Sequence, residues 1–176
     1  MTAPIASIMA QILLGWILAD FLTGLFHWIE DRFGRPQMPV LGPLVFEPNR
    51  LHHAQPVAFT GDGFVTRNWT TWLGAAILWG PMFLMIGAPA WAIVGAFGTA
   101  MSNQIHYWAH RPSLAPGWAK PLQALGLLQS ARHHARHHRP PHLTRYCINT
   151  DWLNPVLDTV KFWSLLEAPL PRRWFA

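Results

Sequence analysis

Residues 90–110 read AWAIVGAFGTAMSNQIHYWAH, and this stretch decides how the rest of the chain is interpreted. Its first part is apolar and rich in Gly and Ala, a composition that suits close packing between helices in a membrane. Its last part carries His106 and His110, which on a helix lie about 40° apart around the axis and therefore share one face. We expect a membrane-spanning helix over about 90–108 whose last turns present two imidazoles on one side.

Two further apolar runs precede this stretch, at about 5–29 and 69–86, and each is long enough to cross a hydrocarbon core of about 30 Å. The first run has no Lys or Arg before it, so we expect it to be retained and not removed as a signal peptide. Residues 32–68 and 111–176 are predicted to form a cap at the membrane surface, with amphipathic helices over about 118–138 and 149–166. The sequence thus predicts an all-α integral membrane bundle of about three spans, built as a single domain over 1–176.

The composition excludes an ordinary soluble domain. Hydrophobic residues make up 51% of the chain and charged residues only 12%, which is too little polar surface to coat a soluble fold. The net charge of +5 is distributed unevenly, because Lys and Arg are absent from 1–31 and from 68–110. This asymmetry follows the positive-inside rule, so we expect the basic face and the C-terminus to be cytoplasmic, in contact with anionic lipid headgroups, and we expect no nucleic-acid partner.

The histidines are the chemical signal of the sequence. The predicted topology places all ten on the same membrane face, and Asp31 lies one helical turn after the first of them. Neutral imidazole is a strong ligand for iron, copper, nickel and zinc, and a single zinc ion needs only four ligands. Eight to ten candidate ligands on one face exceed that number, so two metal ions are the economical interpretation.

Three other polar residues are predicted to support these ligands or to add to them, namely His133, His142 and Asn103. Asp20, inside the first span, is costly to bury and is expected to have a hydrogen-bonding or functional role. The single cysteine, Cys147, makes thiolate ligation of an iron–sulfur cluster improbable and excludes an intramolecular disulfide. Taken one at a time, the histidines also fit blander roles, such as a surface pair at 52–53 or a basic lipid-binding stripe at 132–139.

Several segments together resemble the Kua/CarF lipid desaturase family, which includes plasmanylethanolamine desaturases. The resemblance runs from about residue 19 to residue 163 and is most specific between His133 and Asn154. One departure lies in 60–64, where Asp62 takes the place of a histidine. The segments that carry the resemblance are ADF (19–21), GLFHW (24–28), LHH (51–53), the spacing of Asn103, His106 and His110, HHARHH (133–138), PH (141–142), YCI (146–148) and WLN (152–154).

The resemblance implies a membrane desaturase with a histidine-ligated di-iron centre that uses O₂ and two electrons. The metal positions that it implies in this chain are His27, Asp31, His52, His53, His106, His110, His134, His137 and His138. It would introduce a double bond into an alkyl or acyl chain of a phospholipid, including the vinyl ether bond of plasmalogens. The lipid chain is expected to enter between the Gly- and Ala-rich spans, with its headgroup near Arg50, Arg111 or Arg136. Electrons are expected from a donor such as cytochrome b5 or ferredoxin, since the sequence has no flavin or nucleotide motif. A membrane di-iron hydroxylase and a non-catalytic metal-binding membrane protein remain as alternatives.

Overall fold

The computed structural model describes residues 4–176, which form helices joined by turns, with no strand among them. The predicted all-α class is therefore confirmed. The long segments are α1 (Ile5–Phe33), α3 (Phe64–Ile86) and the consecutive pair α4 (Ala90–Ala100) and α5 (Ser102–His110). The short elements are η1 (Gly42–Phe46), α2 (Glu47–Ala54), η2 (Ala58–Gly61), η3 (Pro112–Leu114), α6 (Ala119–Ala124), α7 (Ala131–His134), α8 (Leu153–Thr159), α9 (Phe162–Glu167) and η4 (Arg172–Trp174).

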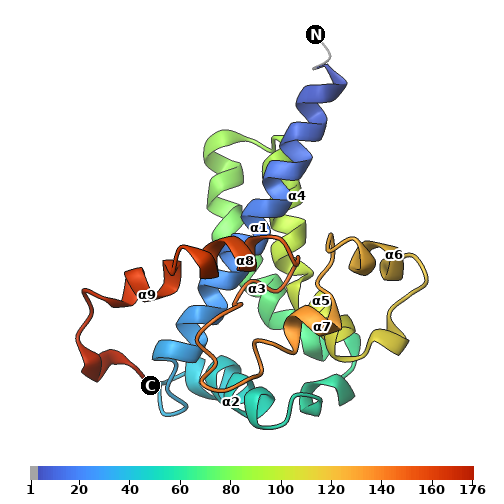
Figure 1. Ribbon diagram of the computed structural model, residues 1–176. Helices are drawn as coiled ribbons and strands as arrows, with labels where there is room; N and C mark the ends of the chain where they lie inside the picture. The colour runs from blue at the N-terminus through green and yellow to red at the C-terminus, as the bar shows by residue number, and fades with distance from the viewer. Residues whose placement is uncertain (1–3) are drawn as a thin grey trace.

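The long helices form the membrane part of the molecule. α1 and α3 are long and apolar enough to cross a bilayer, yet only 17% and 11% of their most apolar stretches are buried. Apolar side chains such as Leu84, which is 91% exposed, therefore face lipid and not a protein core. In Figure 1, α1, α3 and α4 stand together in one half of the molecule, while α2, α5 and α7 gather at the other end. The chain is a membrane protein with a helical cap at one end.

The span boundaries differ from the predicted ones. α1 continues to Phe33, α3 begins at Phe64, and the expected third span breaks at Met101 into α4 and α5. At the break the Thr99 hydroxyl donates to the Gly95 carbonyl and the Ser102 hydroxyl donates to the Thr99 carbonyl. Such side-chain bonds compete with the backbone hydrogen bonds of a helix and often bend it. α5 is thereby able to leave the direction of α4 and carry its histidines into the cap.

The Gly- and Ala-rich faces of the spans are filled by side chains of neighbouring helices. A Cβ atom added at Gly98 would lie 2.6 Å from the Cβ of Ala19 on α1, so the two backbones approach closely. Gly95 is covered in the same way by the ring of Trp79 on α3. Small residues at such crossings let membrane helices pack tightly. At Gly95 and Gly98, helix packing thus fills the space between the spans where a slot for a lipid chain was expected.

The prediction of one amphipathic helix over 118–138 is wrong. The chain forms α6 and α7 instead, because Gly126 adopts the left-handed conformation with φ of +69° and ends α6. The N–H of Leu127 donates to the carbonyl of Leu122, and the N–H of Gly126 donates to that of Gln123, as in a Schellman motif. After this motif, Ser130 is the N-cap of α7, and its hydroxyl accepts a hydrogen bond from the His133 N–H.

The second predicted amphipathic helix, over 149–166, is also wrong. Residues 149–151 belong to an extended segment, and the helical part is divided into α8 and α9 at Lys161, which has φ of +53°. α9 is held against α1 by Glu167, whose carboxylate accepts from the Arg32 guanidinium at 2.7 and 2.9 Å and from the Trp28 indole at 2.9 Å. These bonds fix α9 to the C-terminal end of α1.

Candidate metal centre

One face of α1 organises the site. Asp20, Gly24, His27 and Asp31 follow one another at spacings of four, three and four residues, so they form a single stripe along the helix. The extended segment 146–150 runs along this stripe. Asn149 and Thr150 bond to Asp20, Cys147 packs against Gly24, and the Tyr146 carbonyl lies 3.0 Å from His27 Nδ1.

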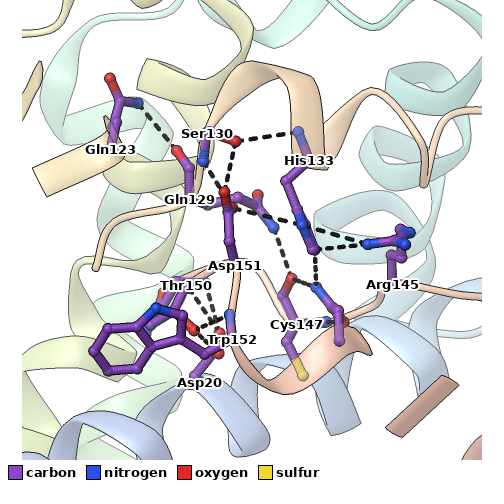
Figure 2. Close-up of polar contacts among 12 residues, drawn as sticks. Asp20, Gln123, Gln129, Ser130, His133, Arg145, Cys147, Thr150, Asp151 and Trp152 are labelled. Atoms are coloured by element: carbon purple, nitrogen blue, oxygen red, sulfur yellow. Dashed lines mark hydrogen bonds and ion pairs between the residues drawn. The ribbon is translucent and has the colours of Figure 1, made fainter. Parts of the chain in front are cut away.

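Asp20 is the buried anchor of that segment. It is 0% exposed, and its carboxylate accepts the N–H groups of Asn149 and Thr150 at 2.8 and 3.0 Å and the Thr150 hydroxyl. Figure 2 shows these contacts together with the neighbouring bonds that tie the segment to residues 129–133. The Gln129 amide donates to the Cys147 carbonyl at 2.7 Å, which holds the base of α7 near the stripe. The intramembrane aspartate is therefore a hydrogen-bonding anchor. It fixes the segment 146–150, whose Tyr146 carbonyl in turn orients His27.

The first group of candidate ligands consists of five histidines. Their ligand atoms lie within 4.8 Å of one another, and they come from α2, α5 and the α7 region. The Nε2 atoms of His106, His110 and His134 form a near-equilateral triangle with sides of 2.8, 2.8 and 3.1 Å. The other two members complete the group: His138 Nε2 lies 3.0 Å from His134 Nε2, and the ring of His52 packs edge-on against that of His106 at 4.5 Å.

Hydrogen bonding does not account for this triangle. A neutral imidazole nitrogen either donates or accepts, so three such atoms in mutual contact leave at least one side repulsive. A metal ion does account for it. Nitrogen ligands at about 2.1 Å from one octahedral ion are separated by about 3.0 Å along each edge of the polyhedron. The triangle thus has the dimensions of one face of a metal coordination shell.

The second group combines three histidines with one carboxylate: His27, Asp31, His53 and His137. His53 Nε2 lies 2.9 Å from Asp31 Oδ1, and His137 Nε2 lies 3.3 Å from Asp31 Oδ2. His27 Nε2 lies 3.7 Å from Asp31 Oδ1. The two groups adjoin each other, since the rings of His53 and His138 are 5.1 Å apart. Three imidazoles and a carboxylate form a donor set that suits iron, zinc or manganese.

Backbone carbonyls fix the orientation of two of these rings. The Nδ1–H of His27 donates to the Tyr146 carbonyl at 3.0 Å, and that of His137 donates to the Thr144 carbonyl at 2.8 Å. A carbonyl only accepts, so Nδ1 carries the proton in both rings and Nε2 keeps a free lone pair. Both Nε2 atoms point toward Asp31, are buried, and have no hydrogen-bond partner within residues 4–176. Histidines that ligate metals are commonly held this way by a bond at the other nitrogen.

Buried ligand atoms without partners test whether the residues fit metal ions. Both nitrogens of His52 and the Oδ2 atom of Asp31 are buried without a hydrogen bond in the described part of the chain. Burial, followed by the neighbouring imidazoles, lowers the pKa of His52 and of His134 far below the usual value and lowers that of His138 to about 2. These rings are neutral at pH 7, as metal ligation requires, so the residues fit a pair of ions.

One residue of the site was not recognised in the sequence. Asn49 of α2 donates from Nδ2 to Asp31 Oδ1 at 2.6 Å and so orients the only carboxylate of the second group. Phe59 is a second omission: its ring packs at 4.8 and 5.0 Å from those of His52 and His106 and shields the first group from water. The only signal for Asn49 was its position three residues before His52, one helical turn away.

The three predicted supporting residues lie outside both groups. Asn103 turns away and donates to the Arg67 carbonyl at 2.8 Å, which joins α5 to α3. His133 accepts from the Asn154 amide at 3.0 Å on the other side of α7. His142 donates from Nδ1 to the His137 carbonyl at 3.0 Å, and its ring stacks edge-on against that of His53 at 4.7 Å. None of the three belongs to either group of candidate ligands, and of the three His142 packs against a ring of the second group.

Comparisons with known proteins give the family of the chain. The family model of the lipid desaturase domain matches residues 16–173, nearly the whole described chain. The chain is 34% identical to a plasmanylethanolamine desaturase of Myxococcus xanthus over 91% of its own length and 59% of that protein. It is also 34% identical to plasmanylethanolamine desaturase 1 of Mus musculus, over 87% of its length and 61% of the mouse protein.

A viral relative is closer to the chain in length. It is named "Probable fatty acid desaturase", comes from Acanthamoeba polyphaga mimivirus, and is 32% identical over 90% of this chain and 80% of its own. The chain thus spans about three fifths of the bacterial and mouse relatives and four fifths of the viral one. No solved structure matches the chain. The chain belongs to the lipid desaturase family, a family of lipid-desaturating oxidoreductases.

Proposed function

We propose that the protein is a phospholipid desaturase that holds two iron ions, one in each group of ligands, and uses O₂ with electrons from a donor protein. The observation that carries the proposal is the convergence of nine metal-ligating side chains into two adjoining groups. Removing two hydrogen atoms from neighbouring carbons of a lipid chain is an oxidation. Zinc has no redox chemistry, whereas iron is suited to imidazole and carboxylate ligands and to reactions with O₂.

The overall reaction balances as follows. One –CH₂–CH₂– unit, O₂, two electrons and two protons give one –CH=CH– unit and two molecules of water. The metal pair, when bound, supplies the oxidising power for the removal of hydrogen from an unactivated C–H bond. Everything else in the reaction falls to the protein: it holds the ligands, excludes water and places the lipid chain.

The residues of the chain divide this work between them. The Tyr146 and Thr144 carbonyls keep the Nε2 lone pairs of His27 and His137 directed at the second ion. Asn49 holds the Asp31 carboxylate in a fixed orientation, so that this carboxylate would be preorganised to bind an ion in the second group. Phe59 covers the His52 and His106 side of the first group, which would keep water from that side of a reactive centre.

Orientation, substrate and donor are parts of the same proposal. The cap should face the cytoplasm, because Lys and Arg are absent from 1–31 and 68–110 and abundant beside the ligands.

Plasmanylethanolamine is the first substrate to test, since two relatives are named for its desaturation. A small electron-transfer protein such as cytochrome b5 or ferredoxin would supply the electrons. The whole chain from 1 to 176 should act as one domain, because the ligands come from elements between α1 and the turn after α7.

Metal analysis combined with lipid mass spectrometry tests the proposal. The purified protein should contain iron near two atoms per chain, and cells that express it should gain a phospholipid lighter by two hydrogens. His106→Ala and His137→Ala, one in each group, should each lower the iron content and abolish the product. Lys120→Gln, an exposed change on α6, serves as the control and should retain both. A wild-type protein that binds only zinc, or a product that gains oxygen in place of a double bond, would contradict the proposal.

A further inference from the structure

The segment 131–138 separates two cavities of opposite character. Ala131 and His134 of α7 and Ala135 and His138 of the turn that follows line the first cavity. Arg132, His133 and Arg136 belong to the other side and line the second. The two cavities have volumes of about 300 and 270 Å³, and no residue lines both. The segment therefore presents alanine side chains to one cavity and arginine side chains to the other, and it also carries metal-ligand candidates.

The first cavity is an apolar recess that ends at the five-histidine group. Its remaining wall consists of Pro56, Ala109 and Pro112, and three members of the group, including His110, form its floor. Small apolar side chains around a reactive floor suit a slender hydrocarbon chain that has no polar atoms to satisfy. Two large apolar residues that follow Pro112 in the sequence are exposed as well, Leu114 at 60% and Trp118 at 59%.

The second cavity is basic. Arg132 and Arg136 are both exposed at its rim, where planar guanidinium groups can bind phosphate oxygens in pairs. The cavity also contains Asp151, whose carboxylate would repel an anion. Its oxygens are engaged already, because Oδ1 accepts the Ser130 N–H at 2.9 Å and Oδ2 accepts the Ser130 hydroxyl at 2.6 Å. Two arginines against one carboxylate leave the cavity with a net positive charge.

We propose that one phospholipid straddles this segment, with its saturated chain in the cavity of Ala131 and Ala135 and its phosphate on Arg132 and Arg136. The inference rests on the proposed function and adds the binding site to it. An apolar recess at the metal ligands and a basic recess one turn away match the two ends of an amphipathic lipid. Between α4 and its neighbours, by contrast, Gly95 and Gly98 are covered by side chains of α1 and α3.

The test uses photolabelling of the purified, iron-loaded full chain in lipid nanodiscs, because labelling needs no turnover. One probe is a phospholipid with a diazirine in its alkyl chain, and the other is the same alkylglycerol without the phosphate. The phospholipid should label peptides that contain 109–112 and 131–135. Ala135→Phe should lower labelling by both probes at least tenfold. The paired change Arg132→Gln and Arg136→Gln should lower labelling by the phospholipid at least tenfold and leave labelling by the alkylglycerol unchanged.

Matched controls separate local effects from misfolding. Ala124→Phe and Arg172→Gln make the same changes at exposed positions outside both cavities, and both should label as the wild type does. Iron content and thermal unfolding of each variant show whether it is folded. Labels on α1, α3 and α4 alone, or labelling by the phospholipid that withstands the arginine changes, would overturn the inference. Labelling as expected by a protein that yields no unsaturated lipid would contradict the proposed function and leave the binding site standing.

Discussion

Replacing Asp20 gives the sharpest test of how the site is held together. Its carboxylate accepts three hydrogen bonds, from the N–H groups of Asn149 and Thr150 and from the Thr150 hydroxyl, at a position that is 0% exposed. Asp20→Ala leaves three buried donors without partners, and each unpaired donor costs about 1–3 kcal/mol. The sum, about 3–9 kcal/mol, is comparable to the whole free energy of unfolding of a typical domain, about 5–15 kcal/mol.

Asp20→Asn provides the matched comparison. Both backbone N–H groups bond to Oδ1, and the asparagine carbonyl can still accept them. Only the Thr150 hydroxyl loses its acceptor, so the expected loss falls to about 1–3 kcal/mol. Asp62→Ala removes an exposed carboxylate and should leave the free energy of unfolding unchanged to within about 0.5 kcal/mol.

Thermal unfolding in detergent, followed together with bound iron, measures both effects. The expected order of stability is wild type and Asp62→Ala first, then Asp20→Asn, then Asp20→Ala. Iron should be lost in the same order, because the segment that Asp20 holds also supplies the carbonyl that orients His27. If Asp20→Ala unfolds at the wild-type temperature with a full complement of iron, the reasoning is refuted.

Three further predictions follow from the site and its frame. Asn49→Leu should weaken metal binding by the second group about 10- to 100-fold, because Asp31 loses the donor that orients it. Metal titration of the purified protein would show this as one weakened site of two. Gly98→Leu should lower the melting temperature, because the new side chain overlaps α1 and overpacking costs about 1–3 kcal/mol; an unchanged melting temperature would mean that α4 moves freely. In the metal-free protein the pKa of His52 and that of His134 are lowered, so the unfolded state binds more protons below pH about 6.5. Stability should therefore fall as the pH drops from 7.5 to 5.5, by up to about 1.4 kcal/mol per pH unit for each ring, and a flat pH profile of unfolding would count against their burial as neutral groups.

The helical class, the membrane character and the family follow from features that are local in the sequence. Apolar runs of membrane length need no long-range information, and a histidine pair such as His106 and His110 lies on one helical face whatever surrounds it. The resemblance to the family was likewise based on short motifs, and the family match over 16–173 confirms it. The convergence of the histidines was anticipated because hydropathy places their segments at the same end of the bundle.

The division of the ligands into two groups depends on turns that the helical pattern conceals. His134, His137 and His138 share an arc only if the helix continues, yet α7 ends at His134. In the tight turn that follows, the N–H of His137 donates to the carbonyl of His134, and His137 enters the other group. The break at Gly126 has a similar origin, because a single glycine inside an apolar, helix-forming stretch is not a strong signal on its own.

Contacts across long stretches of chain were beyond sequence reasoning for a different reason. Asp20 meets Thr150 across 130 positions, and Glu167 meets Arg32 across 135. Each pair is polar on both sides, and nothing in the local pattern tells one partner of the other. Asn103 is a similar case: its spacing from His106 gives no sign of the bond that its amide donates to the Arg67 carbonyl on α3.

The segment 146–150 also determines when the centre can form during synthesis. α1 carries His27 and Asp31 and leaves the ribosome early, whereas His137 and the carbonyl of Tyr146 emerge more than a hundred residues later. Until then, the nascent chain holds an incomplete set of ligands beside a buried, uncapped aspartate. On the proposed function, metal loading would accordingly be a late event in biogenesis, because a chain arrested before Thr150 would lack the segment that bonds to Asp20 and orients His27.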